Sequence, residues 1–214
     1  MNRKTIRILL CMLLFCLSMA LLERVIQPGY LLKSLLKITL CLGIVLFCGG
    51  FGTLFRKDGL LSGLILGGGI YAVILGAFLI FRGFIDLDAI AAGILGKEGI
   101  SRENFLWVAL YISFGNSLLE ELLFRGIAYL QLRRYVPEKY ALCFSSLAFA
   151  GYHVAILDGW FTWWIYLLCM VGLFLGGLIF DLLDRRGSIL PSWLAHMGAD
   201  LAINTIGLMM YGLI

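Results

Sequence analysis

The sequence predicts an all-α protein, a polytopic membrane bundle of about 7–8 transmembrane helices. Hydrophobic residues make up 62% of its 214 residues and charged residues only 14%, whereas a soluble domain is about half apolar and a quarter charged. The mean hydropathy is +0.99. The apolar residues gather in runs of about 20, the length that a helix needs to cross the hydrocarbon core.

Three hydrophobic segments precede the first long polar stretch. Residues 6–22 follow a basic start and carry Ser18 and Ala20, which resemble the small residues of a signal-peptide cleavage site. Because membrane segments continue throughout the chain, we expect an uncleaved first span, which Pro28 and Gly29 end. The second span is expected at residues 35–55 and the third at 60–81.

A polar stretch and a long helix follow. Residues 82–103 hold seven charged residues in the sequence, and their apolar middle, residues 87–95, predicts a short helix along the membrane interface. Residues 104–134 predict one long helix whose basic last turns leave the membrane. Pro137 is expected to prevent its continuation.

The last third of the chain predicts further spans at residues 139–157 and 160–183. Three tryptophans are expected to form an interfacial belt, namely Trp160, Trp163 and Trp164. Residues 188–214 predict either one long helix or two short ones that meet near Gly207. We expect one integral membrane domain, with N-terminal helices and the interfacial segment in residues 1–103 and the core helices in residues 104–214.

The distribution of basic residues predicts a multi-pass protein of the cell membrane with a cytoplasmic N-terminus. The segments expected on the N-terminal side hold Arg3, Lys4, Arg7, Arg56, Lys57, Arg133, Arg134, Lys139, Arg185 and Arg186. The segments expected on the far side hold Arg24, Lys33, Lys37, Arg82, Lys97 and Arg102.

Composition also excludes several classes of partner. The net charge is only +4, and the sequence has neither a basic run with interleaved aromatic residues nor a glycine-rich phosphate loop. We therefore expect the lipid bilayer and a peptide or lipidated protein as partners, and no nucleic acid. The six cysteines lie in apolar runs without a CxxC pair, which indicates reduced residues of the membrane core.

Two adjacent carboxylates, Glu120 and Glu121, lie inside an apolar segment. A carboxylate near the middle of a bilayer costs roughly 3 kcal/mol or more, so the pair indicates a functional site. Arg125 lies four residues after Glu121 and is expected to neutralise it, which leaves Glu120 free for chemistry. Asn116 lies on the same helix face as Glu120. The structural alternative is a charge-paired packing device.

Both histidines of the chain, His153 and His196, lie in predicted spans. Phe149 precedes His153 by one turn, and His196 begins a polar stripe that continues with Asp200 and Asn204. A single buried histidine is most often a core residue with satisfied hydrogen bonds. Two intramembrane histidines together with Glu120 favour a shared site instead.

These residues form three ordered motifs, EExxxR, FxxxH and HxxxD, at Glu120-Glu121-Arg125, Phe149-His153 and His196-Asp200. The set resembles the CAAX protease and bacteriocin-processing family, also called the Abi family, of intramembrane endopeptidases. The resemblance implies an all-helical membrane enzyme that hydrolyses a peptide bond. Eukaryotic relatives remove the last three residues of prenylated proteins, and bacterial relatives are linked to bacteriocin maturation and self-immunity.

The resemblance also implies roles for the motif residues. Glu120 and His153 would activate the attacking water, His196 and Asp200 would stabilise the oxyanion, and Glu121 and Arg125 would support the site. The family often has Asn where this chain has Asp200, and an ionised Asp cannot donate a hydrogen bond. Either Asp200 stays protonated, or it orients His196, or Asn204 supplies the donor.

A metal-independent protease that uses Glu120 as base is the favoured mechanism, and no cofactor is expected. In the zinc alternative, Glu120, His153 and His196 supply three ligands and water takes the fourth place. Two other functions stay open, a non-catalytic membrane immunity or scaffold protein and a proton-coupled transporter, since Glu and His chains also relay protons.

Overall fold

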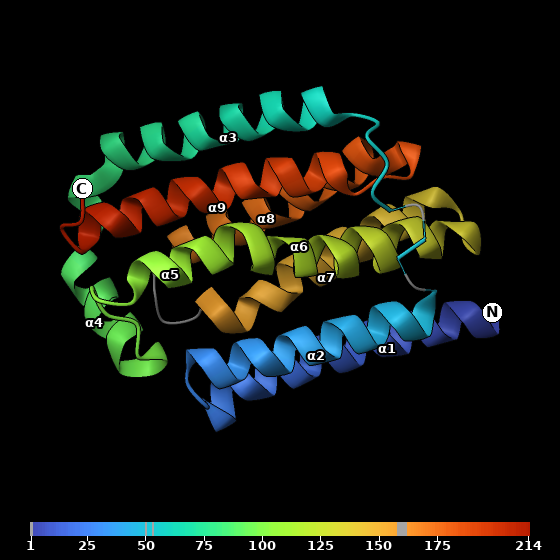
Figure 1. Ribbon diagram of the computed structural model, residues 1–214, viewed down its shortest axis with the longest axis horizontal. Coiled ribbons are helices and arrows are strands. Elements are labelled where there is room, and N and C mark those ends of the chain that lie inside the picture. The colour runs from blue at the N-terminus through green and yellow to red at the C-terminus, as the bar shows by residue number, and fades with distance from the viewer. Residues whose placement is uncertain (1, 50, 53, 158–161) are drawn as a thin grey trace.

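The computed structural model describes residues 2–49, 51–52, 54–157 and 162–214, which form an all-helical bundle without a β-strand (Figure 1). In chain order its α-helices are α1 (Arg3–Leu21), α2 (Tyr30–Cys48), α3 (Leu60–Phe81), α4 (Leu87–Glu98), α5 (Phe105–Leu110), α6 (Ser117–Glu121), α7 (Glu138–Leu157), α8 (Trp163–Leu183) and α9 (Leu190–Met210). The fold class that the sequence predicted is confirmed.

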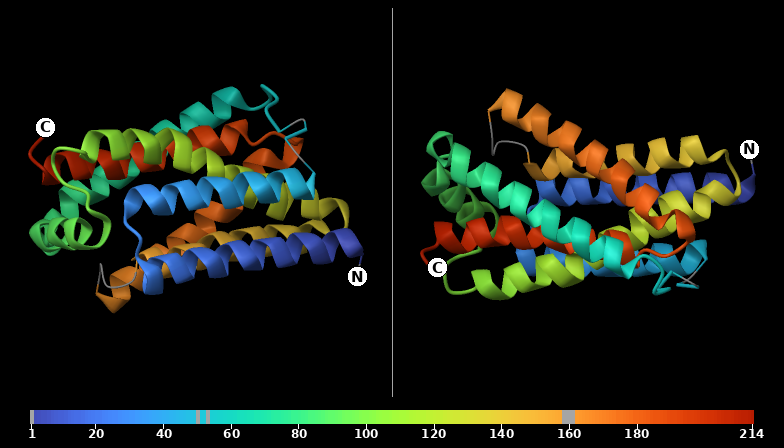
Figure 2. Two further views of the ribbon diagram at one scale, coloured as in Figure 1. Left: turned by 60° about the horizontal axis from the view of Figure 1, so that its bottom comes forward. Right: turned by 90° about the horizontal axis from the view of Figure 1, so that it is seen from above.

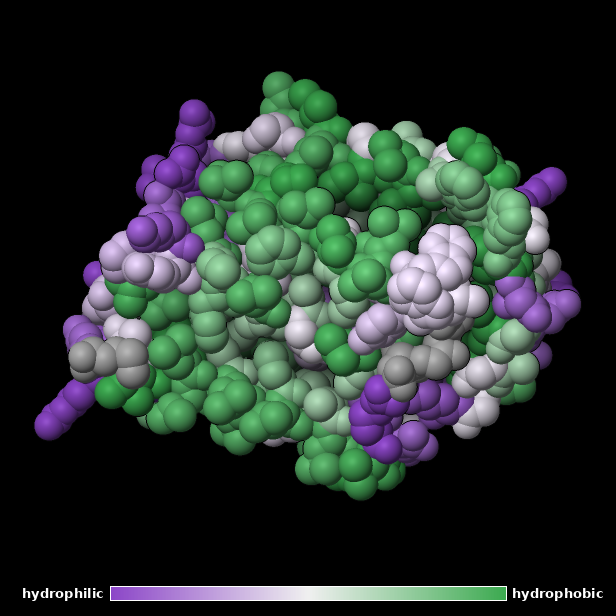
Figure 3. Space-filling model, turned by 180° about the vertical axis from the view of Figure 1, so that it is seen from behind, coloured by the Kyte–Doolittle hydropathy of each residue, from purple (hydrophilic) through white to green (hydrophobic). Residues whose placement is uncertain are grey.

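Five helical runs in the described residues are long and apolar enough to cross a membrane. They are Arg3–Ile26, Tyr30–Cys48, Leu60–Phe84, Glu138–Leu157 and Trp163–Arg186. Apolar side chains cover the middle of the surface in Figure 3, and polar side chains gather toward its two ends. Because an apolar belt of this kind needs lipid around it, the chain is a multi-pass membrane protein.

The predicted helix over residues 104–134 is confirmed as one continuous helical run, Phe105 to Arg134. It passes from α5 through a π-helical segment, Tyr111–Asn116, into α6, and then through a second π-helical segment, Leu122–Gln131. Every residue from Leu122 to Leu130 is buried. The run therefore lies at the centre of the bundle, with Glu120 and Glu121 near its midpoint.

The α2 helix corrects the predicted boundaries of the second span. It covers Tyr30–Cys48 instead of residues 35–55, because it begins directly after Gly29 and ends before the glycine-rich residues 49–52. Gly29 has φ +79°, a conformation that favours glycine. Lys37 lies within α2 and is buried there, so grouping it with the basic residues of the far-side segments is wrong.

The α3 and α9 helices lie side by side along most of their length (Figure 2). Their backbones approach closely at glycines: a Cβ on Gly67 would lie 2.7 Å from the Leu194 carbonyl oxygen, and one on Gly198 would lie 2.2 Å from the Gly67 carbonyl oxygen. Small residues allow such packing in membrane bundles. The α9 helix is also continuous through Gly207, which selects the single-helix alternative.

The two ends of the bundle match the predicted grouping of loops. At the N-terminal end, Arg185 pairs with Glu138 at 2.7 Å. At the opposite end, Lys33 pairs with Glu98 at 2.6 Å and ties α2 to the short helix α4, which covers the predicted interfacial segment (Figure 1). In the predicted tryptophan belt, Trp163 and Trp164 are exposed, and Trp160 lies outside the described residues.

Candidate active site

The structure brings the three predicted acid–base residues together from three helices. Glu120 comes from α6, His153 from α7 and His196 from α9. Glu120 Oε2 lies 3.8 Å from Nε2 of His153 and 3.8 Å from Nε2 of His196. In the described part of the chain this buried oxygen has no hydrogen-bond partner. Both imidazoles therefore face one carboxylate oxygen, at a distance too long for a direct hydrogen bond.

The contacts of His153 determine which ring nitrogen faces Glu120 as an acceptor. Its Nδ1 lies 2.8 Å from the carbonyl oxygen of Phe149. A carbonyl oxygen only accepts, so Nδ1 carries the proton, and Nε2 of the neutral ring keeps its lone pair. Phe149 also packs its ring against His153, with centroids 4.7 Å apart. One residue thus fixes both the orientation and the tautomer of His153.

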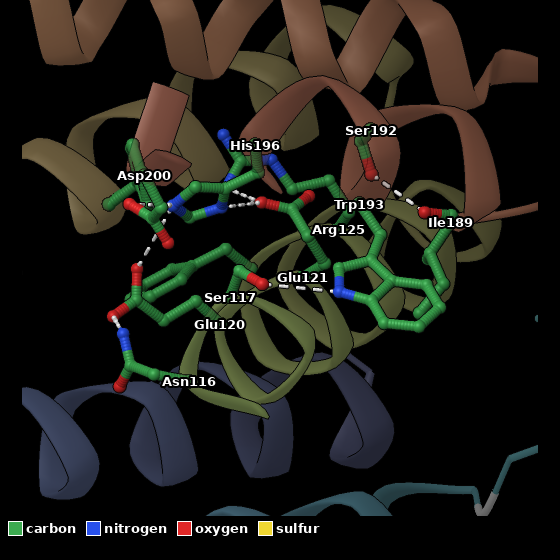
Figure 4. A network of polar contacts seen from close by, with 12 residues as sticks. Asn116, Ser117, Glu120, Glu121, Arg125, Ile189, Ser192, Trp193, His196 and Asp200 are labelled. Carbon is green, nitrogen blue, oxygen red and sulfur yellow. Dashed lines mark hydrogen bonds and ion pairs between the residues drawn. The ribbon is translucent and has the colours of Figure 1, made fainter. Parts of the chain in front are cut away.

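His196 is oriented by the second glutamate of the pair. Its Nδ1 lies 2.7 Å from Glu121 Oε1, whereas its Nε2 lies 3.8 Å from both Glu120 Oε2 and Asp200 Oδ1 (Figure 4). The Glu121 carboxylate accepts a hydrogen bond from Nδ1–H of His196. Nε2 is the ring atom that remains directed toward Glu120 and Asp200.

Glu121 and Arg125 form the predicted ion pair at the base of the site. Arg125 Nη1 donates to Glu121 Oε1 at 3.2 Å, and both side chains are fully buried. The guanidinium also lies 4.2 Å from the centre of the Phe149 ring. The pairing matches the division predicted from the sequence, in which Arg125 neutralises Glu121 and leaves Glu120 to other contacts.

Asp181 on α8 is a second partner of Arg125 that sequence reasoning missed. Its Oδ1 lies 3.6 Å from Arg125 Nε, and it accepts hydrogen bonds from Ser145 at 2.9 Å and Ser146 at 3.2 Å. A carboxylate inside an otherwise apolar span was the available signal. Asp181 ties α8 to α7 and to the central helix beneath the site.

The two polar residues that follow His196 on α9 have different surroundings: Asp200 lies in the site, and Asn204 makes a packing contact. Asp200 faces His196 with Oδ1, and its buried Oδ2 has no hydrogen-bond partner among the residues that the structure describes. Asn204 instead donates to the Ala109 carbonyl oxygen at 3.1 Å and to Ser113 Oγ at 2.9 Å. Asn204 thus joins α9 to the central helix, and its amide is not directed at His196.

Lys37 is the site residue that the sequence analysis missed. Its Nζ lies 2.6 Å from Glu120 Oε1 and 2.7 Å from the Tyr152 hydroxyl, and it also donates to Asn116 Oδ1. Asn116 Nδ2 donates to the same Glu120 oxygen at 2.9 Å. The signal in the sequence was a lysine followed by the uncharged segment 38–48. Counting Lys37 among the basic residues of the far-side segments concealed it.

The described residues contain no group of three or more His, Cys, Asp and Glu side chains arranged to hold a metal ion. The zinc alternative named Glu120, His153 and His196 as ligands. In the structure the ammonium of Lys37 already occupies the Oε1 side of Glu120. The positive charge next to Glu120 Oε1 in the structure is therefore that of Lys37.

Comparison with known proteins identifies the family of the central region. Residues 102–202 match the family model for type II CAAX prenyl endopeptidase Rce1-like proteins. The match contains Glu120, His153, His196 and Asp200, and it excludes Lys37. No curated protein and no solved structure matches the chain. Residues 102–202 are therefore similar to the Rce1-like family of type II CAAX prenyl endopeptidases, and the resemblance that the three motifs indicated is confirmed over this region.

Proposed function

We propose that the protein is an intramembrane endopeptidase that hydrolyses a peptide bond in a membrane-associated peptide or lipidated protein. The family model that residues 102–202 match supports a protease of the CAAX type. The observation that carries the proposal is the position of Glu120 Oε2, which is buried and lies 3.8 Å from the Nε2 atoms of both His153 and His196. One water can contact the carboxylate and an imidazole there.

In the proposed reaction, Glu120 and His153 activate the water. The water donates one hydrogen bond to Glu120 Oε2 and one to the lone pair of His153 Nε2, which orients its oxygen toward the peptide carbonyl carbon. As the C–O bond forms, the proton passes to Glu120. General base catalysis of this kind contributes about 10²–10⁴-fold. The His153 side chain is 16% exposed, compared with 3% for Glu120, which supports approach of the peptide from the His153 side.

His196 is proposed to stabilise the oxyanion. With Nδ1–H bonded to Glu121, a second proton on Nε2 makes the ring a cation whose Nε2–H donates to the carbonyl oxygen as it becomes negative. Glu120 then returns its proton to the leaving nitrogen, the C–N bond breaks, and an amine and a carboxylic acid leave. Removal of one oxyanion donor costs about 10²–10³-fold in other hydrolases.

We propose that the reaction is metal-independent. The ammonium of Lys37 lies 2.6 Å from Glu120 Oε1 and would repel a divalent cation bound at the same carboxylate. Glu120, His153 and His196 are therefore a poor fit for a zinc ligand set. Lys37 also supplies positive charge next to the carboxylate without a bound ion.

We further propose that the N-terminal end of the bundle faces the cytoplasm and that the protein lies in the cell membrane. The basic residues that the sequence assigned to the N-terminal side outnumber those of the far side. Moving Lys37 from the far-side loops into the bundle increases this bias, because cytoplasmic loops carry the excess of Lys and Arg.

Cleavage of defined peptides by detergent-purified protein tests the proposal. The peptides are a farnesylated CAAX peptide, its unprenylated form and an unlipidated bacteriocin-type precursor peptide. We expect the wild type to cleave at least one, and Glu120→Ala and His153→Ala to lose at least about 10²-fold in kcat. The peptide cleaved identifies the substrate class. Equal turnover by the wild type and both variants would refute the assignment.

A further inference from the structure

We propose that Lys37 is a positioning residue for Glu120, and that helix α2 thereby completes a site whose motif residues all lie within residues 102–202. The inference rests on the proposed function and adds to it a residue from the N-terminal part of the chain. Its evidence is the set of contacts that Lys37 makes inside the bundle.

The ammonium group of Lys37 is saturated with acceptors. It has three N–H donors, and it contacts three acceptor atoms: Asn116 Oδ1, Glu120 Oε1 and the Tyr152 hydroxyl. Only 4% of the residue is exposed. When all three N–H groups of a lysine donate hydrogen bonds, its nitrogen has no lone pair with which to accept a proton. Lys37 therefore serves as a fixed charge, and the proton transfers stay with Glu120 and the histidines.

Lys37 determines which oxygen of Glu120 is available. Lys37 and Asn116 both donate to Oε1, at 2.6 Å and 2.9 Å. Oε1 is thus occupied, and the planar carboxylate presents Oε2 to His153 and His196. Removing Lys37 would leave a buried charge without its partner, which is strongly unfavourable. Glu120 would then bind a proton or rotate, and either change removes the base from its position.

A second contact holds α2 in register with the central helix. Cys41, one turn after Lys37, is fully buried, and its Sγ lies 3.2 Å from the Leu119 carbonyl oxygen. Cys41 and Lys37 lie on the same face of α2, so this face packs against the residues around Glu120. The N-terminal helices therefore contribute a charged group to the site as well as membrane anchorage.

Kinetics of purified variants test the catalytic part of the proposal. We expect Lys37→Met to lower kcat by about 10²-fold with KM changed by less than about threefold, because the base is displaced while peptide binding is retained. Lys37→Gln keeps a donor for Glu120 and should lose less. The matched control is Lys33→Met, four residues earlier on α2, which breaks partly buried pairs with Glu23 and Glu98 at the far end and should keep wild-type kcat.

A thermal unfolding cycle tests the Lys37–Glu120 contact without any activity. We expect Lys37→Met and Glu120→Gln each to lower Tm, and the double variant to recover at least about half of the summed loss. Additive losses would refute the pairing. A folded Lys37→Met protein with wild-type kcat, or a Lys37→Gln protein that loses as much kcat as Lys37→Met, would refute the positioning role. If the wild type cleaves no peptide, the proposed function fails. The thermal unfolding cycle would still show whether Lys37 and Glu120 interact.

Discussion

Nδ1 of His196 lies 2.7 Å from Oε1 of Glu121, and this contact assigns the two adjacent glutamates to different tasks. Glu121 binds Nδ1 of the imidazole and itself accepts a hydrogen bond from Arg125. Glu120, one residue earlier, faces Nε2 of the same ring with Oε2, a carboxylate oxygen that has no hydrogen-bond partner in the described residues. Adjacent helical residues point about 100° apart, so the same helix can direct Glu121 to Nδ1 of His196 and Glu120 toward its Nε2.

Replacing Glu121 tests this division. We expect Glu121→Gln to lower kcat by at least about 10²-fold, because an amide can offer an N–H to Nδ1 and so stabilise the wrong tautomer of His196. Peptide cleavage by folded, purified protein is the measurement. Asp181→Asn is the control, since it changes the other carboxylate beside Arg125 without touching His196. Full activity of Glu121→Gln would show that His196 needs no such support.

Replacing Asp200 tests the alternative in which its protonated carboxyl group is a second oxyanion donor beside His196, and the expected results below apply to that alternative. We expect Asp200→Asn to retain activity within about tenfold of the wild type, since asparagine keeps the shape and can donate a hydrogen bond. Asp200→Leu should lose about 10²–10³-fold, the cost of one missing oxyanion donor. Both are measured as kcat on the same peptide. Complete loss in Asp200→Asn would instead assign an essential charge to the carboxylate.

Metal removal tests the proposed role of Lys37 as the cation at Glu120. We expect protein treated with 1,10-phenanthroline and then freed of chelator to keep its kcat within about twofold, because the ammonium already neutralises the carboxylate. The metal content of the same sample is measured in parallel. Activity that disappears with the metal and returns with added zinc would contradict the metal-independent mechanism.

Substitutions at two neighbouring glycines of α3 test whether close backbone packing holds α9 against α3. We expect Gly67→Ala to destabilise the protein by about 1–3 kcal/mol, because the new Cβ would lie 2.7 Å from the Leu194 carbonyl oxygen. Gly68→Ala is the control: its Cβ would meet nothing within 4 Å in the described structure, so its effect should stay below about 0.5 kcal/mol. Thermal unfolding in detergent measures both. Similar losses in the two variants would exclude close packing as the cause.

The sequence by itself determined the class of fold and the contacts within single helices. Long apolar runs need lipid and become helices, because only helices and closed barrels satisfy the backbone there. Residues four apart on a helix share a face, so the pairs Glu121–Arg125 and Asn116–Glu120 were predictable without a structure. The same spacing linked Phe149 to His153.

Only the tertiary structure decided which side chains from different helices meet. Lys37 and Glu120 lie 83 residues apart in the chain, and Glu121 and His196 lie 75 apart. In a membrane protein the lipid-facing and bundle-facing sides of a helix are both apolar, so hydrophobic periodicity does not fix how each helix is rotated about its axis. Close packing at small residues and the buried polar contacts fix that rotation. Lys37 contacts Glu120 only when α2 has the correct rotation about its axis.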